Sequence, residues 1–221
     1  EKQAPYQPTY YIPDPANPGT YQPLTAYKDL YFLTTVSSLH NFDGSYTPAG
    51  EVYYIEYTTS IGSSPDQAVI TKATVMDADE ATAAADRYNQ QAQPGTGAAV
   101  VSTNFIQPTT DIPALSHYRL VHESPTNVFS GSSPDVKYVK IFEYVPGARI
   151  KGEGIIELPL VSNTGRAFVY RQQSTNGEFV VPYSTEGNPY DVRATGKYKI
   201  TGTGRQISVS EDAIMRGLQI T

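Results

Sequence analysis

The sequence predicts an α+β fold, in which a small α/β layer precedes an all-β antiparallel sandwich. Between residues 50 and 102, two strand-like runs are followed by an alanine-rich stretch and a third strand-like run. After Pro113, short apolar runs alternate with glycine, proline or asparagine, a spacing typical of antiparallel sheets. The 18 tyrosines, 17 prolines and 17 glycines among 221 residues also favour a β-rich chain.

Residues 1–23 form a Pro/Tyr-rich segment that differs from the rest of the chain. Proline fixes φ and lacks an N–H donor, so we expect an extended arm that is poorly able to form a central strand. A plain linker is one interpretation. The tyrosines have few charges beside them, which favours an arm docked on its own fold or on a neighbouring chain. The docking candidates are Tyr6, Tyr10, Tyr11 and Tyr21.

Residues 24–113 contain the predicted α/β layer. Apolar spacing close to 3.6 residues predicts a first helix, which the turn 41–44 ends. Aspartates after Val75 suit a helix N-terminus and predict a second helix that stops before Pro94. The predicted elements are helices over 24–40 and 77–91 and strands over 51–59, 67–75 and 97–102.

The predicted sandwich follows, and we place its boundary in the loop 130–135. The chain then divides into an arm (1–23), an α/β segment (24–130) and a β-sandwich peripheral domain (131–221). The predicted strands after Pro113 are 117–123, 137–144, 149–152, 154–161, 166–172, 178–181, 190–194, 197–201 and 206–210.

Composition excludes several classes of protein. A net charge of −6 argues against a nucleic-acid binder, and the absence of cysteine excludes disulfide scaffolds, zinc–thiolate sites and thiol catalysis. No apolar run approaches the roughly 18 residues of a membrane span, and no signal peptide is present. We expect an extracytoplasmic, cell-surface protein, processed or excised from a longer product because it begins at Glu1.

Motifs for metal or phosphate chemistry fail on spacing. Asp77–Asp79 resembles the start of a calcium loop, but Thr82 and Tyr88 occupy the places of the required glycine and glutamate, so helix capping is favoured. The doublets Gly152–Gly154 and Gly202–Gly204 lack the third glycine of a dinucleotide loop and predict hairpin turns.

The three histidines also suggest no metal site. His117 and His122 lie five residues apart, so a regular strand would place them on opposite faces. His40 is expected at a helix end, where a cation is favourable. We therefore predict no catalytic, cofactor-binding or metal-binding residue in this chain.

Seven parts of the chain have distinctive sequences: 38–45 (SLHNFDGS), 51–57 (EVYYIEY), 117–125 (HYRLVHESP), 139–148 (VKIFEYVPGA), 164–166 (TGR) with 169–171 (VYR), 181–185 (VPYST) and 192–196 (VRATG). Together these segments resemble the archaeal, methanogen-type oligosaccharyltransferases of the AglB family, over roughly residues 24–212. A separate likeness, over residues 146–194, is to prealbumin-like and carboxypeptidase-regulatory sandwiches.

The resemblance implies the C-terminal extracytoplasmic region of such an enzyme. That family transfers a lipid-linked glycan to a sequon asparagine with a divalent metal held elsewhere, and it recognises the sequon with a WWDYG motif. The chain has no tryptophan, and Asp66 lies six residues before Lys72, the wrong spacing for the family's DxxK-type motif. No family site residue can therefore be assigned here.

The expected role is non-catalytic, either bracing the enzyme or orienting its acceptor. The implied partner is the membrane and core part of the parent enzyme, with no cofactor in this chain. One alternative is a self-assembling filament or sheath subunit whose arm docks on identical subunits or surface-layer proteins. A second alternative is a glycan-binding surface module that uses exposed tyrosines.

Overall fold

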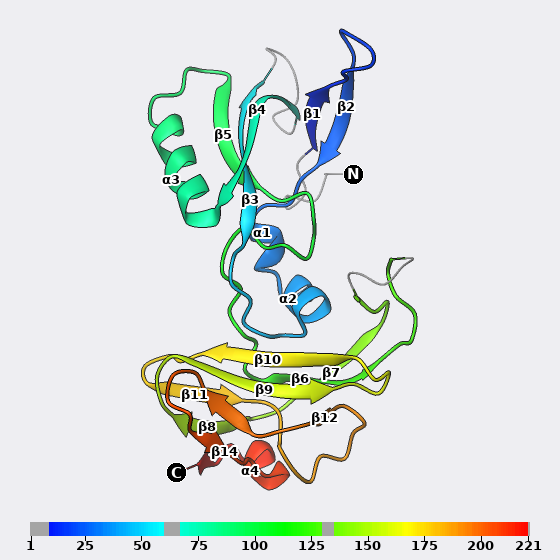
Figure 1. Cartoon of the computed structure of the whole chain (residues 1–221), viewed down its shortest axis with the longest axis vertical. Helices are drawn as coiled ribbons and strands as arrows, with labels where there is room; N and C mark the ends of the chain where they lie inside the picture. The colour runs from blue at the N-terminus through cyan, green and yellow to red at the C-terminus, as the bar shows by residue number, and fades with distance from the viewer. Residues whose placement is uncertain (1–8, 60–66, 130–134, 221) are drawn as a thin grey trace. The chain divides into compact units, whose positions relative to one another are not determined.

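The computed structural model describes residues 9–59, 67–129 and 135–220 (Figure 1). The chain forms two compact units. Unit 1 contains the residues up to Thr34 together with Pro48–Ile112, and unit 2 contains Thr35–Thr47 together with the residues from Pro113 onward. The chain therefore passes between the units three times, after Thr34, Thr47 and Ile112.

Unit 1 is a five-stranded sheet with a helix on one face (Figure 1). The strand order is β2-β1-β4-β3-β5, and only β1 and β4 run parallel. Helix α3 packs against β3 and β5. The elements are β1 (Thr9–Pro13), β2 (Tyr21–Thr25), α1 (Asp29–Phe32), β3 (Glu51–Thr58), β4 (Gln67–Asp77), α3 (Ala78–Asn89) and β5 (Thr96–Val101).

Alternation along β3 explains why this sheet is buried on both faces. Val52 and Tyr54 pack with the alanines of α3, whereas Ile55 faces a second cluster that includes Tyr10. The predicted helix start is confirmed, because the Asp77 side chain accepts a hydrogen bond from the Asp79 N–H.

Two expectations for the first 40 residues are wrong. The prolines do not keep the arm out of the sheet: β1 lies between β2 and β4, because Pro13 ends β1 and Pro23 lies on the edge strand β2. Residues 24–40 are not one helix. Tyr27 exchanges backbone hydrogen bonds with Ser102, so its backbone belongs to a β-bridge.

Unit 2 contains three small sheets around one core. The sheets are β10-β9-β13-β14 with β12 on β9, β11-β8-β15, and β6-β7. Its helices are α2 (Thr35–Phe42) and α4 (Glu211–Arg216). Its strands are β6 (Tyr118–Glu123), β7 (Lys140–Tyr144), β8 (Ala148–Lys151), β9 (Ile155–Val161), β10 (Ala167–Gln173), β11 (Glu178–Val181), β12 (Arg193–Ala194), β13 (Tyr198–Ile200), β14 (Gln206–Ile207) and β15 (Gln219–Ile220).

The core of unit 2 follows the alternation of its strands. Along β9, Ile156, Leu158 and Leu160 are buried and their neighbours are half-buried. Tyr170 on the paired strand β10 packs in the same cluster. This periodicity of two is the pattern that the sequence showed, and the α+β class is confirmed.

The structure divides the chain differently from the boundary expected near residue 130. Strand β6 precedes that loop and β7 follows it, yet the two pair antiparallel within unit 2. Residues 130–134 themselves lie outside the described residues. The sequence also did not indicate α4 or β15. No helix among the described residues is both long and apolar enough to cross a bilayer.

Candidate functional site

The most concentrated group of charged side chains in unit 2 begins at the end of α2. Asp43 has φ 56° and Gly44 has φ 68°, both left-handed, a conformation that Asp and Gly adopt more readily than most residues. The Gly44 N–H donates to Ser38 O and closes the helix. Asp43 is consequently buried rather than exposed beyond the helix end.

Arg166, which precedes β10, joins this aspartate to a second carboxylate. Its guanidinium donates to both oxygens of Asp43, at 2.8 and 3.0 Å, and to Glu123 at 2.6–3.1 Å. The planar fork of arginine suits such paired carboxylates. Lys140 adds a second cation, with its Nζ 2.7 Å from Asp43 Oδ1 and 2.7 Å from His40 O. We call Asp43, Glu123, Lys140 and Arg166 the Arg166 network.

Glu123 is the most buried member of the Arg166 network, with a fully buried side chain. Burial alone would raise its pKa, but hydrogen bonds from Arg166, Ser162 and Thr164 outweigh burial and lower the pKa to about 2. Burial acts in the opposite sense on Arg166, whose pKa is nevertheless raised by its two carboxylate partners. The network therefore holds Glu123 and Arg166 in their charged forms.

The Arg166 network also holds the chain that follows Asp43. The Ser45 hydroxyl accepts from Arg171 N at 2.8 Å, and Tyr46 N donates to Arg171 O at 2.8 Å. The Leu115 N–H donates to Gly44 O. Residues 44–46 thus lie along the outer edge of β10, and Thr35–Thr47 is fixed in unit 2 by charge and by backbone pairing.

A second arginine network holds α4. Arg119, which is 1% exposed, donates to both carboxylate oxygens of Glu211, at 2.7 and 2.9 Å, and to Glu143 at 2.8 Å. Ser184 also donates to Glu211, and the Tyr190 ring centroid lies 5.4 Å from the guanidinium. Burial would raise the pKa of Glu211, but Arg119 and Ser184 lower it. We call Arg119, Glu143 and Glu211 the Arg119 network.

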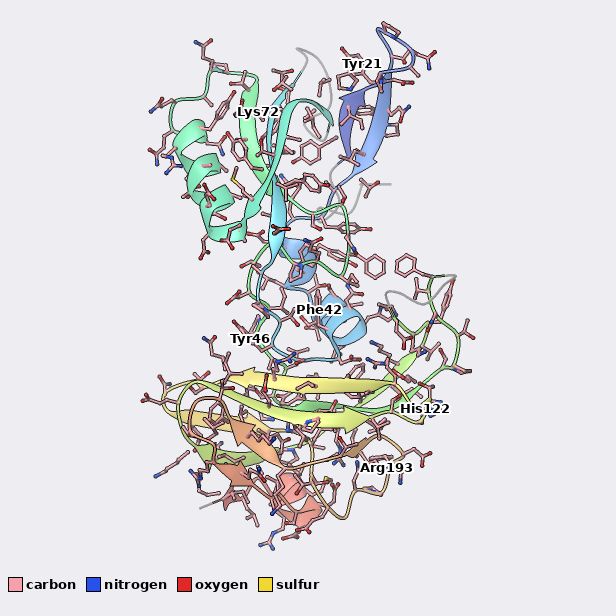
Figure 2. All side chains as sticks on the ribbon, viewed as in Figure 1. Tyr21, Phe42, Tyr46, Lys72, His122 and Arg193 are labelled. Carbon is pink, nitrogen blue, oxygen red and sulfur yellow. The ribbon has the colours of Figure 1, made fainter. Side chains whose placement is uncertain are left out.

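The candidate docking tyrosines do not form one group. Tyr6 lies outside the described residues. Tyr10 is buried beside Tyr57, with ring centroids 5.8 Å apart, and Tyr11 is half-buried. Tyr21 is 52% exposed at the start of β2 (Figure 2). Their use as contacts to another chain stays a prediction.

The histidines have local contacts. His40 lies in the last turn of α2, with Nδ1 3.1 Å from Asn41 Oδ1, and His117 Nδ1 lies 3.1 Å from Val145 O. His122 is exposed near the end of β6 (Figure 2). In the part of the chain that the structure describes, no three His, Asp or Glu side chains are grouped to hold a metal. The two glycine doublets are turns, between β8 and β9 and between β13 and β14.

Unit 1 contains a shallow cavity of about 310 Å³ between residues 28–30, α3 and β5. Asn89 lies in the wall of this cavity. Its side-chain amide is hydrogen-bonded to both Ala98 N and Ala98 O. Asp29, also in the wall, accepts from the Thr109 hydroxyl. Polar side chains here stabilise the edge of β5.

Sequence reasoning missed both arginine networks. Their members are far apart in the chain, so no local spacing groups them. The Arg166 network does, however, draw on four of the segments that carry the family resemblance, since Asp43, Glu123, Lys140 and Arg166 each lie in a different one.

Residues 147–220 match the family model of the archaeal glycosylation protein B long peripheral domain. The chain is also 26% identical, over 259 aligned residues, to the dolichyl-monophosphooligosaccharide–protein glycotransferase AglB of Haloferax volcanii. That alignment covers 94% of this chain and 24% of the relative. The chain is similar to the archaeal AglB enzymes over most of its length. Its part after Pro146 corresponds to their peripheral domain.

One solved structure has a similar fold. The crystal structure of the Archaeoglobus fulgidus oligosaccharyltransferase, tethered with an acceptor peptide containing the NVT sequon, has a TM-score of 0.51 and 17% identity, and the match covers 97% of this chain and 27% of that one. The apo form of the enzyme gives a TM-score of 0.48 and 20% identity, over 97% and 26% of the two chains. The chain thus spans about a quarter of the length of these AglB relatives.

Replacing Glu123 tests the charge of the Arg166 network. Because its pKa is lowered from 4.5 to about 2, Glu123 contributes stability above pH 4.5 that is lost as the pH falls toward 2. We expect Glu123→Gln to lower the free energy of unfolding by about 3 kcal/mol at pH 7 and to flatten its pH dependence between 4.5 and 2. Urea unfolding at several pH values measures both.

Glu157→Gln is the matched control, since Glu157 pairs with Arg171 at the surface. We expect it to change stability by less than about 1 kcal/mol and to keep the acid slope. Equal losses in the two variants would contradict a special role for Glu123.

Replacing Glu211 tests the Arg119 network. Glu211→Gln leaves Arg119 with only one carboxylate, so we expect a loss of about 2–4 kcal/mol in unfolding free energy. Asp212→Asn, one residue along α4, affects only an exposed pair with Arg216 and should cost less than about 0.5 kcal/mol. Indistinguishable unfolding midpoints for the two variants would show that Arg119 does not hold α4.

Proposed function

We propose that the chain is a non-catalytic C-terminal soluble region of a membrane oligosaccharyltransferase that N-glycosylates secreted proteins, and that it braces the enzyme. The observation that carries the proposal is the Arg166 network. Its cations and carboxylates are matched in number and bonded to one another, so it stabilises the fold and leaves no charged group poised for acid–base work.

Chain order supports a bracing role. The segment Thr35–Thr47 comes between the two parts of unit 1 in sequence, and yet it is fixed in unit 2. Each unit is therefore tied to the other by three covalent connections rather than by a single linker. A region that is connected in this way suits mechanical support of a larger enzyme better than it suits a freely swinging module.

On this proposal the working partner is the membrane and core part of the same enzyme, which would keep the region extracytoplasmic. Glycosyl transfer and its divalent metal belong to that part, and this chain needs no cofactor. A filament or sheath subunit, a surface-layer partner and a glycan-binding module receive no support from the related proteins. An acceptor-orienting role is a second candidate, favoured by the edge of β7 that pairs with no other strand among the described residues.

The test uses a full-length oligosaccharyltransferase that carries this region. We expect Arg166→Met to shorten the half-life of glycosyl-transfer activity at raised temperature at least about tenfold, because two buried carboxylates lose a partner, while kcat at low temperature stays within about twofold. Arg149→Met, which breaks the exposed pair with Glu178, is the matched control and should leave the half-life unchanged.

The isolated chain, given a lipid-linked glycan and a sequon peptide, should yield no glycopeptide. A large drop in kcat for Arg166→Met without faster inactivation, or glycopeptide made by the chain alone, would contradict the non-catalytic role.

A further inference from the structure

Among residues 9–59, 67–129 and 135–220, strand β7 pairs on one side only, with β6 (Figure 1). The Val145 N–H donates to His117 O at 2.8 Å. This bond determines which residues of β7 direct their backbone groups toward β6 and which direct them away. In an antiparallel pair, alternate residues bond across and the residues between them point away. The N–H and C=O groups of Lys140, Phe142 and Tyr144 therefore point away from β6.

The hydrogen bonds of β6 show the same alternation of inward and outward backbone groups. Leu120 lies opposite Phe142, and its N–H donates outward to the Tyr183 hydroxyl at 2.8 Å. Glu123 lies opposite Lys140, and its N–H likewise donates outward, to Asn163. Within the described residues, the outward groups of β7 at 140, 142 and 144 have no hydrogen-bond partner.

Other sheet edges of the protein are protected. Ser45 and Tyr46 pair with Arg171 and cover the edge of β10. Asn89 bonds both backbone groups of Ala98 and covers β5 there. Pro23 interrupts the edge strand β2. The open edge of β7 therefore differs from these three edges, each of which is covered or interrupted in part.

Side chains do not protect β7 either. Lysine on an edge normally discourages pairing, but the Lys140 side chain is 2% exposed and bonded to Asp43. No proline occurs between residues 135 and 145. The strand and the residues before it instead expose apolar side chains: Tyr138 (62%), Val139 (54%), Ile141 (50%) and Tyr144 (64%). Apolar side chains beside unpaired backbone groups are the features that a docking strand requires.

We propose that the outer edge of β7 binds an extended segment of another polypeptide as an added strand. The main chain supplies the hydrogen bonds, so segments of different sequence fit, provided that an apolar side chain packs on Ile141 at one face of β7 or on Tyr144 at the other face. The chain carries a net charge of −6, which favours a neutral or basic segment. The identity of this segment rests on the proposed function: it is part of the acceptor polypeptide, whose sequence varies from one secreted protein to the next.

The absence of tryptophan from the chain allows a direct binding test. The probe is a nine-residue peptide of alternating valine and threonine with one terminal tryptophan and a lysine at each end. We expect saturable binding by tryptophan anisotropy, and slower amide exchange at Lys140, Phe142 and Tyr144 in the complex. Methylating the peptide amides that face β7 should weaken binding about tenfold or more, while methylating the alternate set should change it less than about threefold.

Two variants at one position separate backbone from side-chain recognition. Tyr144→Pro removes an outward N–H and leaves the bonds to β6 in place, so we expect about fivefold or greater loss of affinity relative to Tyr144→Ala. Tyr144→Ala keeps the N–H and removes only the ring. Unchanged exchange at Arg119 and Glu143 confirms that the β6–β7 pair stays folded, and the methylated peptides test the proposal without any variant.

The inference is overturned if the peptide does not bind, if both methylated peptides bind equally well, or if protection falls on another strand. It is also overturned if the same amides become protected in a concentration-dependent dimer without peptide, since the occupant is then a second copy of the chain. These readouts do not involve glycosyl transfer or thermal inactivation, so their failure leaves the bracing role to its own test.

Discussion

Arg166 binds two buried carboxylates, Asp43 and Glu123, of which Asp43 also bonds Lys140. Taking a carboxylate out of water is costly unless charge and hydrogen bonds replace the lost hydration. The arginine supplies both, and Ser162 and Thr164 complete the shell around Glu123. The turn after α2, the end of β6, the start of β7 and the loop before β10 therefore meet at one point.

Much else in unit 2 follows from that meeting point. With Asp43 held, Ser45 and Tyr46 pair with Arg171 along the edge of β10. With Lys140 drawn to Asp43, β7 has no exposed cation on its free edge. The same interaction thus closes one sheet edge and leaves another available for a strand. The proposed bracing role and the proposed docking edge are compatible because they use different groups: charged side chains for the first and backbone groups for the second.

The predictability of the fold depended on whether the signal was local. Alternation in Ile156, Leu158 and Leu160 revealed β9, and the aspartate at position 77 revealed the start of α3. The helix predicted over residues 24–40 was wrong. Their apolar spacing suits a helix, but Tyr27 forms a β-bridge with Ser102, which lies 75 residues further along the chain. The arm was misjudged for a similar reason: its place between β2 and β4 depends on a pairing that no pattern within residues 1–23 contains.

Composition and residue spacing could not predict the candidate site either, because its contacts also join residues that are far apart in the sequence. Asp43 and Arg166 are separated by 123 residues, and a single aspartate in a turn has no distinctive local pattern. Only the family resemblance drew attention to the segments involved, without indicating that their charges pair. The Arg119 network gave less signal still, because Glu211 lies in a helix that the sequence did not predict.

A double-mutant cycle on Asp43 and Arg166 tests the central claim most directly. Asp43→Asn tolerates the left-handed turn, so it removes charge with little backbone strain. Urea unfolding of Asp43→Asn, Arg166→Met and the double variant gives their coupling free energy. We predict a coupling of about 1.5–3 kcal/mol at pH 7, because each partner is buried and bonded to the other. Additivity of the two losses within about 0.5 kcal/mol would contradict the account.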